Sequence, residues 1–128
     1  MTEDRTFWKT ILTSILKIEH AAIFIAATVA YVLVGGSWWL YAVLFFTPDI
    51  SFAAYLAGPR FGAIIYNALH SWVGPAILLT FSLWLDLPMG NAVALIWIAH
   101  IGFDRMLGYG LKHTSDFRDT HLGRIGRQ

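Results

Sequence analysis

Four long apolar stretches constrain this chain more than any other feature. They cover roughly residues 18–34, 38–56, 61–85 and 89–111. Each is close to the ~20 residues that an α-helix needs to cross the hydrocarbon core of a bilayer. Of the 128 residues, 57% are hydrophobic and only 13% are charged. A body of this size cannot bury so much apolar surface in water, so we predict an integral membrane protein.

The breaks between these stretches predict how the helices connect. Residues 35–37, 57–60 and 86–88 are rich in Gly, Pro, Ser and Asp, which favour turns. Because short connections make neighbouring helices antiparallel, the predicted fold class is all-α, an up-down-up-down four-helix bundle. We expect residues 18–111 to form the bundle and residues 112–128 a cytoplasmic tail. Residues 1–17 form either a cytoplasmic amphipathic segment or an extension of the first span.

The basic residues predict the orientation in the membrane. Lys and Arg precede the first span, occur in the second loop and follow the fourth span, whereas the first and third loops carry neither. By the positive-inside rule, both termini are cytoplasmic. The formal net charge is only +1, and no dense basic patch is present, which argues against a nucleic-acid partner. The chain has no Cys, so thiolate metal ligands are excluded.

Ionisable residues inside the apolar stretches are the candidates for function, because a charge in the bilayer costs several kcal/mol. Every span contributes at least one. Counting from the outer ends at ~1.5 Å per residue places five of them in one slab of the cytoplasmic half. These five are Glu19, Asp49, His70, His100 and Asp104. We expect them to meet if their helix faces point into the bundle.

Imidazoles and carboxylates on facing helices are the ligands of Zn, Mn and Fe sites in bundle cores. The sequence therefore predicts a divalent-metal site with Asp49, His70, His100 and Asp104 as ligands. Glu19 is the candidate catalytic base or a further ligand. An open position on such an ion activates water, so a hydrolase is the enzyme class that this residue set favours. The substrate class is a lipid-like molecule that enters from the bilayer.

Three further residues complete the predicted site. Asn67 lies three residues before His70, on the same helix face. Arg60 or Arg105 would hold an anionic head group. A second group of polar residues lies in the tail: His113, Asp116, Asp119 and His121. It caps the cytoplasmic mouth, binds head groups, or only keeps the tail soluble.

Several alternatives stay open at this point. Glu19 is interfacial in one interpretation, and Asp104 forms a structural ion pair with Arg105 in another. His70 and His100 on adjacent helices could ligate a haem, although carboxylates are costly beside an apolar macrocycle. A quinone-binding bundle, an ion conductor and a non-enzymatic accessory subunit of a larger membrane complex are the other hypotheses. The sequence does not decide between an enzyme and these, nor whether the chain forms a homo-oligomer.

Specific motifs also occur along nearly the whole chain, from about residue 16 to 126. They are PDIS at 48–51, YLAGPRFGA at 55–63, YNALH at 66–70, AHIGFDR at 99–105, LGYGLK at 107–112 and THLGRIG at 120–126. These motifs resemble those of domain of unknown function 4260, a family of short bacterial membrane proteins. The resemblance implies a bacterial cytoplasmic membrane location and a tail that belongs to the functional unit. It implies no activity.

Overall fold

The computed structural model describes residues 2–109, 119–120 and 123–124. Its helices are α1 (Thr2–Leu33), α2 (Trp38–Phe45), the 3₁₀ helix η1 (Thr47–Ala57), α3 (Pro59–His70), α4 (Val73–Trp84) and α5 (Pro88–Met106). The short strands β1 (Asp119–Thr120) and β2 (Gly123–Arg124) form an antiparallel pair. The predicted helical class is therefore confirmed. The predicted tail group of histidines and aspartates lies outside the described residues, except for the backbone of Asp119.

Three helical stretches are long and apolar enough to cross a membrane: Thr2–Leu33, Trp38–Ala57 and Pro59–Trp84. The prediction of a membrane protein rests on the length and apolar composition of its helices. It is confirmed to the extent that the structure contains helices of this kind. The 19 residues of α5 would span ~28 Å. Its polar residues make this helix less apolar than the three stretches named above.

The second and third predicted spans are not continuous α-helices. The second divides into α2 and η1 at Phe46, and Pro48 removes a backbone donor at this point. The third divides into α3 and α4 at Ser71, which is extended with φ −95° and ψ 157°. Both interruptions lie next to ionisable residues that the sequence singled out, Asp49 and His70.

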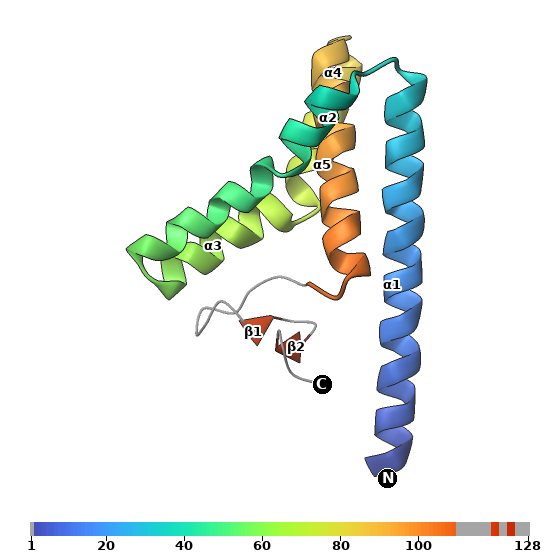
Figure 1. The fold of residues 1–128 in the computed structure, drawn as a ribbon, viewed down its shortest axis with the longest axis vertical. Helices are drawn as coiled ribbons and strands as arrows, with labels where there is room; N and C mark the ends of the chain where they lie inside the picture. The colour runs from blue at the N-terminus through green and yellow to red at the C-terminus, as the bar shows by residue number, and fades with distance from the viewer. Residues whose placement is uncertain (1, 110–118, 121–122, 125–128) are drawn as a thin grey trace.

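Helices α1 and α5 form the long axis of the molecule and pack against each other (Figure 1). Gly102 of α5 makes this contact close. A Cβ at Gly102 would lie 3.0 Å from the backbone nitrogen of Phe24 and 3.1 Å from the backbone oxygen of His20. Helices α2 and α4 also pack on α5. Small residues commonly permit such close helix contact in membranes, as expected for this glycine.

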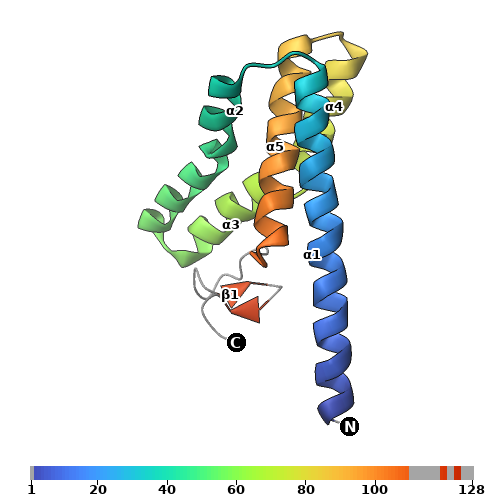
Figure 2. The same ribbon diagram turned by 45° about the vertical axis from the view of Figure 1, so that its right-hand side comes forward.

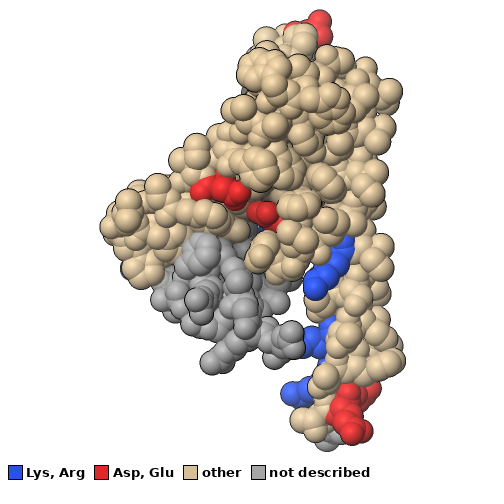
Figure 3. All heavy atoms as spheres, in the orientation of Figure 1, with Lys and Arg blue, Asp and Glu red and all other residues tan. Residues whose placement is uncertain are grey.

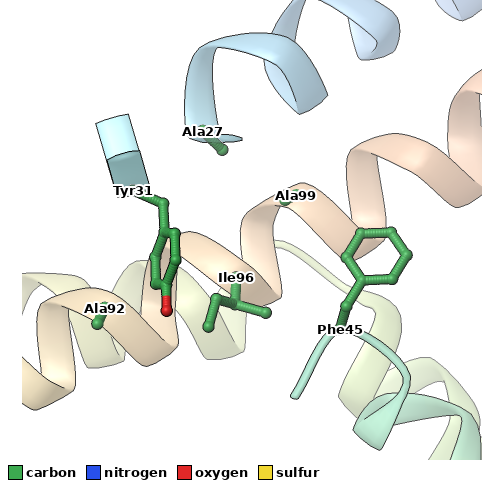
Figure 4. Close-up of a cluster of buried hydrophobic side chains, with 6 residues drawn as sticks. All are labelled: Ala27, Tyr31, Phe45, Ala92, Ile96 and Ala99. Carbon is green, nitrogen blue, oxygen red and sulfur yellow. The ribbon is translucent and has the colours of Figure 1, made fainter. Parts of the chain in front are cut away.

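The hydrophobic core lies where α1, α2 and α5 meet (Figure 4). Its buried members are Ala27, Tyr31, Phe45, Ala92, Ile96 and Ala99. Tyr31 is fully buried and donates its hydroxyl hydrogen bond to the Ser37 carbonyl oxygen over 2.7 Å. This bond ties the loop after α1 to the core and so fixes where α2 begins.

Helices η1 and α3 form a hairpin that projects obliquely from the α1–α5 pair (Figures 1 and 2). The turn between them places Gly58 at φ +120°, a conformation that favours glycine. Gly62 of α3 lies directly under the ring of Tyr55 of η1, so the two helices pack closely. We call this unit, residues 47–70, the side hairpin.

The N-terminal part of α1 extends past the C-terminal end of α5 (Figure 1). Residues 2–10 are exposed in the structure. Lys and Arg side chains lie along this lower part, whereas most of the upper body is uncharged on the same face (Figure 3). Since α1 is one helix from Thr2 onward, no break separates residues 2–17 from the first span. Whether this part is cytoplasmic stays a prediction.

Candidate metal centre

Each of the four predicted metal ligands lies near a helix end. Asp49 is in the first turn of η1, and His70 is the last residue of α3. His100 and Asp104 lie in the last two turns of α5, four residues apart on one face. The two helix interruptions therefore bring Asp49 and His70 of the side hairpin to the C-terminal half of α5.

One ligand atom from each of these four residues converges on a common point. The Nε2 atoms of His70 and His100 are 3.0 Å apart. Oδ1 of Asp49 lies 3.6 Å from His70 Nε2 and 3.4 Å from His100 Nε2. Oδ2 of Asp104 lies 3.3 Å and 3.1 Å from the same two atoms. All four ligand atoms lie within 4.8 Å of one another.

These separations match the edges of a tetrahedral coordination sphere. Metal–ligand bonds of ~2.0–2.1 Å, as zinc forms with imidazole nitrogen and carboxylate oxygen, place neighbouring ligands about 3.3–3.4 Å apart. Five of the six separations lie between 3.0 and 3.6 Å and bracket that value. The sixth joins the two carboxylate oxygens and lies within the 4.8 Å that bounds the whole group. The four atoms are therefore close enough together to hold one first-row ion.

The hydrogen bond at Nδ1 of His70 defines the state of its Nε2, which lies 3.0 Å from His100 Nε2 at hydrogen-bond distance. Nδ1 of His70 lies 2.9 Å from the backbone carbonyl oxygen of Tyr66. Since a carbonyl only accepts, Nδ1 carries the proton and a neutral His70 presents a lone pair at Nε2. The Tyr66 ring also stacks on the imidazole, with centroids 3.8 Å apart and planes 9° apart. This arrangement fixes both the tautomer and the orientation of His70.

His100 is held by packing rather than by a second hydrogen bond. Its side chain is 1% exposed, and the Phe45 ring packs edge-on against it at 5.3 Å. Nδ1 of His100 is buried and has no hydrogen bond of good geometry among the described residues, although the Phe45 backbone interacts with this imidazole. A cation bound at Nε2 leaves the proton on Nδ1. The Phe45 backbone can then accept a hydrogen bond from Nδ1.

Helix α5 satisfies the carbonyl groups at the C-terminal end of α3. Trp97 Nε1 donates to the Leu69 oxygen over 2.6 Å, and Arg105 Nη2 donates to the His70 oxygen over 3.2 Å. Carbonyl groups at a helix end have no partner within the helix and are costly to leave open in a membrane. These two bonds therefore anchor α3 next to His70.

Charge and exposure differ between the two carboxylates. Asp49 is 35% exposed and Asp104 15% exposed, whereas both imidazoles are almost fully buried. Two carboxylates would balance the charge of a divalent cation beside the two buried imidazoles. The C-terminal ends of α3 and α5 also point their negative dipole ends towards this region, which favours a cation. Asp49 lies on the open side of the centre.

Of the other predicted site residues, Glu19 and Arg60 lie outside the group. Glu19 is exposed on α1, and its neighbour His20 instead stacks on Trp72, with centroids 5.8 Å apart. Arg60 is exposed at the opposite end of α3, ~15 Å along the helix from His70. Asn67 is half-buried on α3, one turn before His70. Arg105 adjoins the group through the His70 carbonyl.

Sequence reasoning gave no role to Tyr66, Trp97 or Phe45. Tyr66 precedes His70 by four residues and Trp97 precedes His100 by three, so each shares a helix face with a ligand. That spacing is the signal that could have found them. It is weak by itself, since aromatic residues are frequent throughout this chain.

The fold and the centre define an integral membrane helical protein with a buried His/Asp group. The chain belongs to the family described as domain of unknown function (DUF4260), whose profile matches residues 13–125. The motif resemblance in the sequence is thereby confirmed. Neither the curated proteins nor the solved structures contain a significant match.

Proposed function

We propose that this protein is a divalent-metal-dependent membrane hydrolase whose ion is held by Asp49, His70, His100 and Asp104. The observation that carries the proposal is the convergence of four ligand atoms, all within 4.8 Å of one another. Two nitrogen and two oxygen ligands without sulfur suit Zn, Mn or Fe. A bound ion of this kind supplies Lewis acidity and a water of lowered pKa.

The partial exposure of Asp49 supports catalysis over a purely structural role. Catalytic metal sites keep one position for water or substrate, whereas structural sites are closed by protein ligands. Asp49 is the most exposed of the four ligands, so it is the ligand that can yield its position. The Asp49 carboxylate would then be the base that accepts a proton from water.

The substrate class follows from the position of the centre. It lies in the inner half of α5, beside the apolar side hairpin. An ester- or phosphate-containing lipid-like molecule can present its polar bond at this depth while its chains stay in the bilayer. Arg105 adjoins the centre and is the cation that would orient an anionic group. Arg60 and Asn67 are secondary candidates for this task, and Glu19 is the alternative base.

The topology that accompanies this proposal is the one expected from the sequence. The chain crosses a bacterial cytoplasmic membrane four times, with both termini in the cytoplasm. Exposed basic residues on the N-terminal part of α1 support this orientation (Figure 3).

The second candidate function is a non-enzymatic accessory subunit in which the ion only ties helices together. The complete set of four protein ligands favours this alternative, since structural sites are closed. A haem between His70 and His100 fits less well. Two ligands on opposite sides of an iron stand about 4 Å apart with the macrocycle between them, whereas the Nε2 atoms here are 3.0 Å apart.

Elemental analysis of detergent-purified protein tests the proposal. We expect close to one equivalent of a first-row divalent metal per chain. His100→Ala should lose the metal, because it removes a buried ligand. His20→Ala is the matched control, since His20 lies outside the group and stacks on Trp72. Equal metal content in wild type and His100→Ala would overturn the proposed ligand set.

Hydrolase activity is tested separately on lipid-like ester and phosphate substrates in mixed micelles. The enzyme hypothesis predicts turnover that a chelator abolishes and the metal restores. Glu19→Gln distinguishes the two candidate bases: activity is kept if Asp49 serves and lost if Glu19 serves. A metal-loaded protein with no turnover on any ester or phosphate class supports the accessory-subunit alternative.

A further inference from the structure

Helix α1 carries two apolar stripes on different sides. One stripe packs into the bundle through Phe24, Ala27 and Tyr31. The other stripe runs along the helix in alternating steps of three and four residues, and we call it the outer seam. Its members are Trp8, Ile11, Ile15, Ile18, Ala22, Ile25, Val29 and Val32. Every position of the outer seam is therefore apolar.

The outer seam is exposed in the structure. Ile18 is 69% exposed, Ile25 60% and Trp8 53%. The other members are exposed as well, except for Ile11, which is half-buried. Because each residue turns by about 100° around a helix, the seam lies roughly opposite the stripe that packs into the bundle. The side hairpin lies on the other side of α5 from α1 (Figures 1 and 2). A partner on the seam would thus leave the candidate metal centre unobstructed.

Lipid can cover only part of this seam, because α1 is longer than the hydrocarbon core is thick. Its 32 residues extend over ~48 Å, whereas the core is ~30 Å thick. Helix α5, which runs alongside, already matches that thickness. Gly108 follows the end of α5 and lies beside Lys17, since a Cβ there would be 3.4 Å from Lys17 Cε. Residues 2–16, which we call the extension, therefore continue for ~22 Å past α5 and out of the hydrocarbon.

The extension follows the direction of the membrane span. Residues 2–33 contain neither Gly nor Pro and form one unbroken helix, so the features that commonly bend a helix are missing from this range. Trp8, Ile11 and Ile15 therefore form an apolar row outside the hydrocarbon, while Lys9 and Lys17 point to other sides of the helix. A contiguous apolar row in that position marks an interaction surface.

The spacing of the outer seam identifies its partner as a second helix with the same seam. Apolar residues in alternating steps of three and four form the heptad repeat of a left-handed coiled coil. The repeat passes without interruption from the extension into the membrane span. Lipid favours apolar residues all around a helix, but it does not select this spacing outside the hydrocarbon. A second copy of the chain supplies an identical seam in the same orientation, because every copy inserts into the membrane in the same way.

We propose that the protein is a parallel homodimer in which the α1 helices of two copies pair along the outer seam. The two-fold axis runs along the seam, so each seam residue meets its own counterpart in the second copy. The pairing covers the apolar row of the extension, which lipid does not reach. It does not depend on a bound ion, and it places the two candidate metal centres on the outer sides of the dimer.

Disulfide cross-linking in isolated membranes tests the dimer. The chain contains no Cys, so a single substitution reports only contact between copies. Ile15→Cys lies on the seam, and Thr10→Cys is its matched control, exposed on the same extension but off the seam. Oxidation should convert most Ile15→Cys chains into dimers and few Thr10→Cys chains. Trp8→Cys and Lys9→Cys form a second pair, with the same difference expected.

A charge on the seam should separate the two copies. Ile11→Lys added to Ile15→Cys should lower the cross-linked fraction several-fold, whereas Thr13→Lys, off the seam, should leave it unchanged. Equal cross-linking at the seam and control positions, or none at either Ile15→Cys or Trp8→Cys, overturns the dimer. The seam would then be covered by lipid head groups or by residues 112–128 of the same chain.

Discussion

The hydrogen bond from Trp97 to the end of α3 allows a sharp test of how the centre is held. Nε1 of Trp97 donates to the Leu69 carbonyl over 2.6 Å. Trp97→Phe removes the donor and leaves a buried carbonyl without its partner, at a cost of ~1–3 kcal/mol. Because Leu69 directly precedes His70, the loss also loosens the imidazole that binds the cation.

The expected effect on metal binding follows from the position of this bond. Loss of a group that orients a ligand lowers metal affinity by ~10–100-fold, or about 1.4–2.7 kcal/mol. Zinc titration against a chromogenic competing chelator measures this affinity in detergent. Gly74→Ala should act in the same direction, because its Cβ would overlap the Trp97 ring and displace it.

The matched control for this test is Trp84→Phe. Trp84 is 77% exposed on α4 and should bind zinc as wild type does. Wild-type affinity in Trp97→Phe, with the helical content unchanged, would refute the reasoning that α5 positions His70 through the end of α3.

Three further predictions concern packing and charge. Gly102→Ala should lower the free energy of unfolding by ~1–3 kcal/mol in a detergent titration followed by circular dichroism, because the added Cβ would lie 3.0 Å from the Phe24 backbone nitrogen. An unchanged midpoint of the unfolding transition would contradict the close α1–α5 contact. Tyr31→Phe should cost about 1 kcal/mol in the same assay, as it removes the 2.7 Å hydrogen bond to the loop after α1. Asp49→Asn should lose most of its bound metal in elemental analysis, whereas Asp86→Asn, in the loop after α4, should keep it. Equal metal content in both would exclude Asp49 as a ligand.

The membrane class and the four-residue group could be predicted from the sequence for a simple reason. Apolar length sets where helices cross a bilayer, and depth then follows from counting residues along each helix. Asp49, His70, His100 and Asp104 were matched in depth in this way. Whether these four side chains contact one another depends on how each helix is rotated about its own axis. Depth in the membrane does not define that rotation.

Glu19 illustrates where that counting stops being informative. Its depth matched the other four, but the structure leaves it exposed on α1 while His20 and Phe24 face α5 at Gly102. One residue changes direction by about 100° around a helix. Depth in the membrane therefore does not predict which side chains meet unless the packed face of the helix is also known.

The second and third spans were predicted as continuous apolar stretches over residues 38–56 and 61–85. The structure instead turns η1 and α3 out of the bundle as a hairpin. Composition does not reveal this, because a hairpin inside the bilayer and a continuous span are equally apolar. The residues that tie it back, Trp97 and Arg105, act through backbone carbonyl groups, which have no sequence signature.

X-ray absorption spectroscopy of the zinc-loaded protein tests the central claim most directly. The account predicts four nitrogen or oxygen ligands at ~2.0–2.1 Å, with no sulfur and with the outer-shell scattering of two imidazoles. His100→Ala should reduce this to one imidazole, while His20→Ala leaves the spectrum unchanged. A six-coordinate shell dominated by water, or a spectrum without imidazole scattering, would contradict a centre built from Asp49, His70, His100 and Asp104.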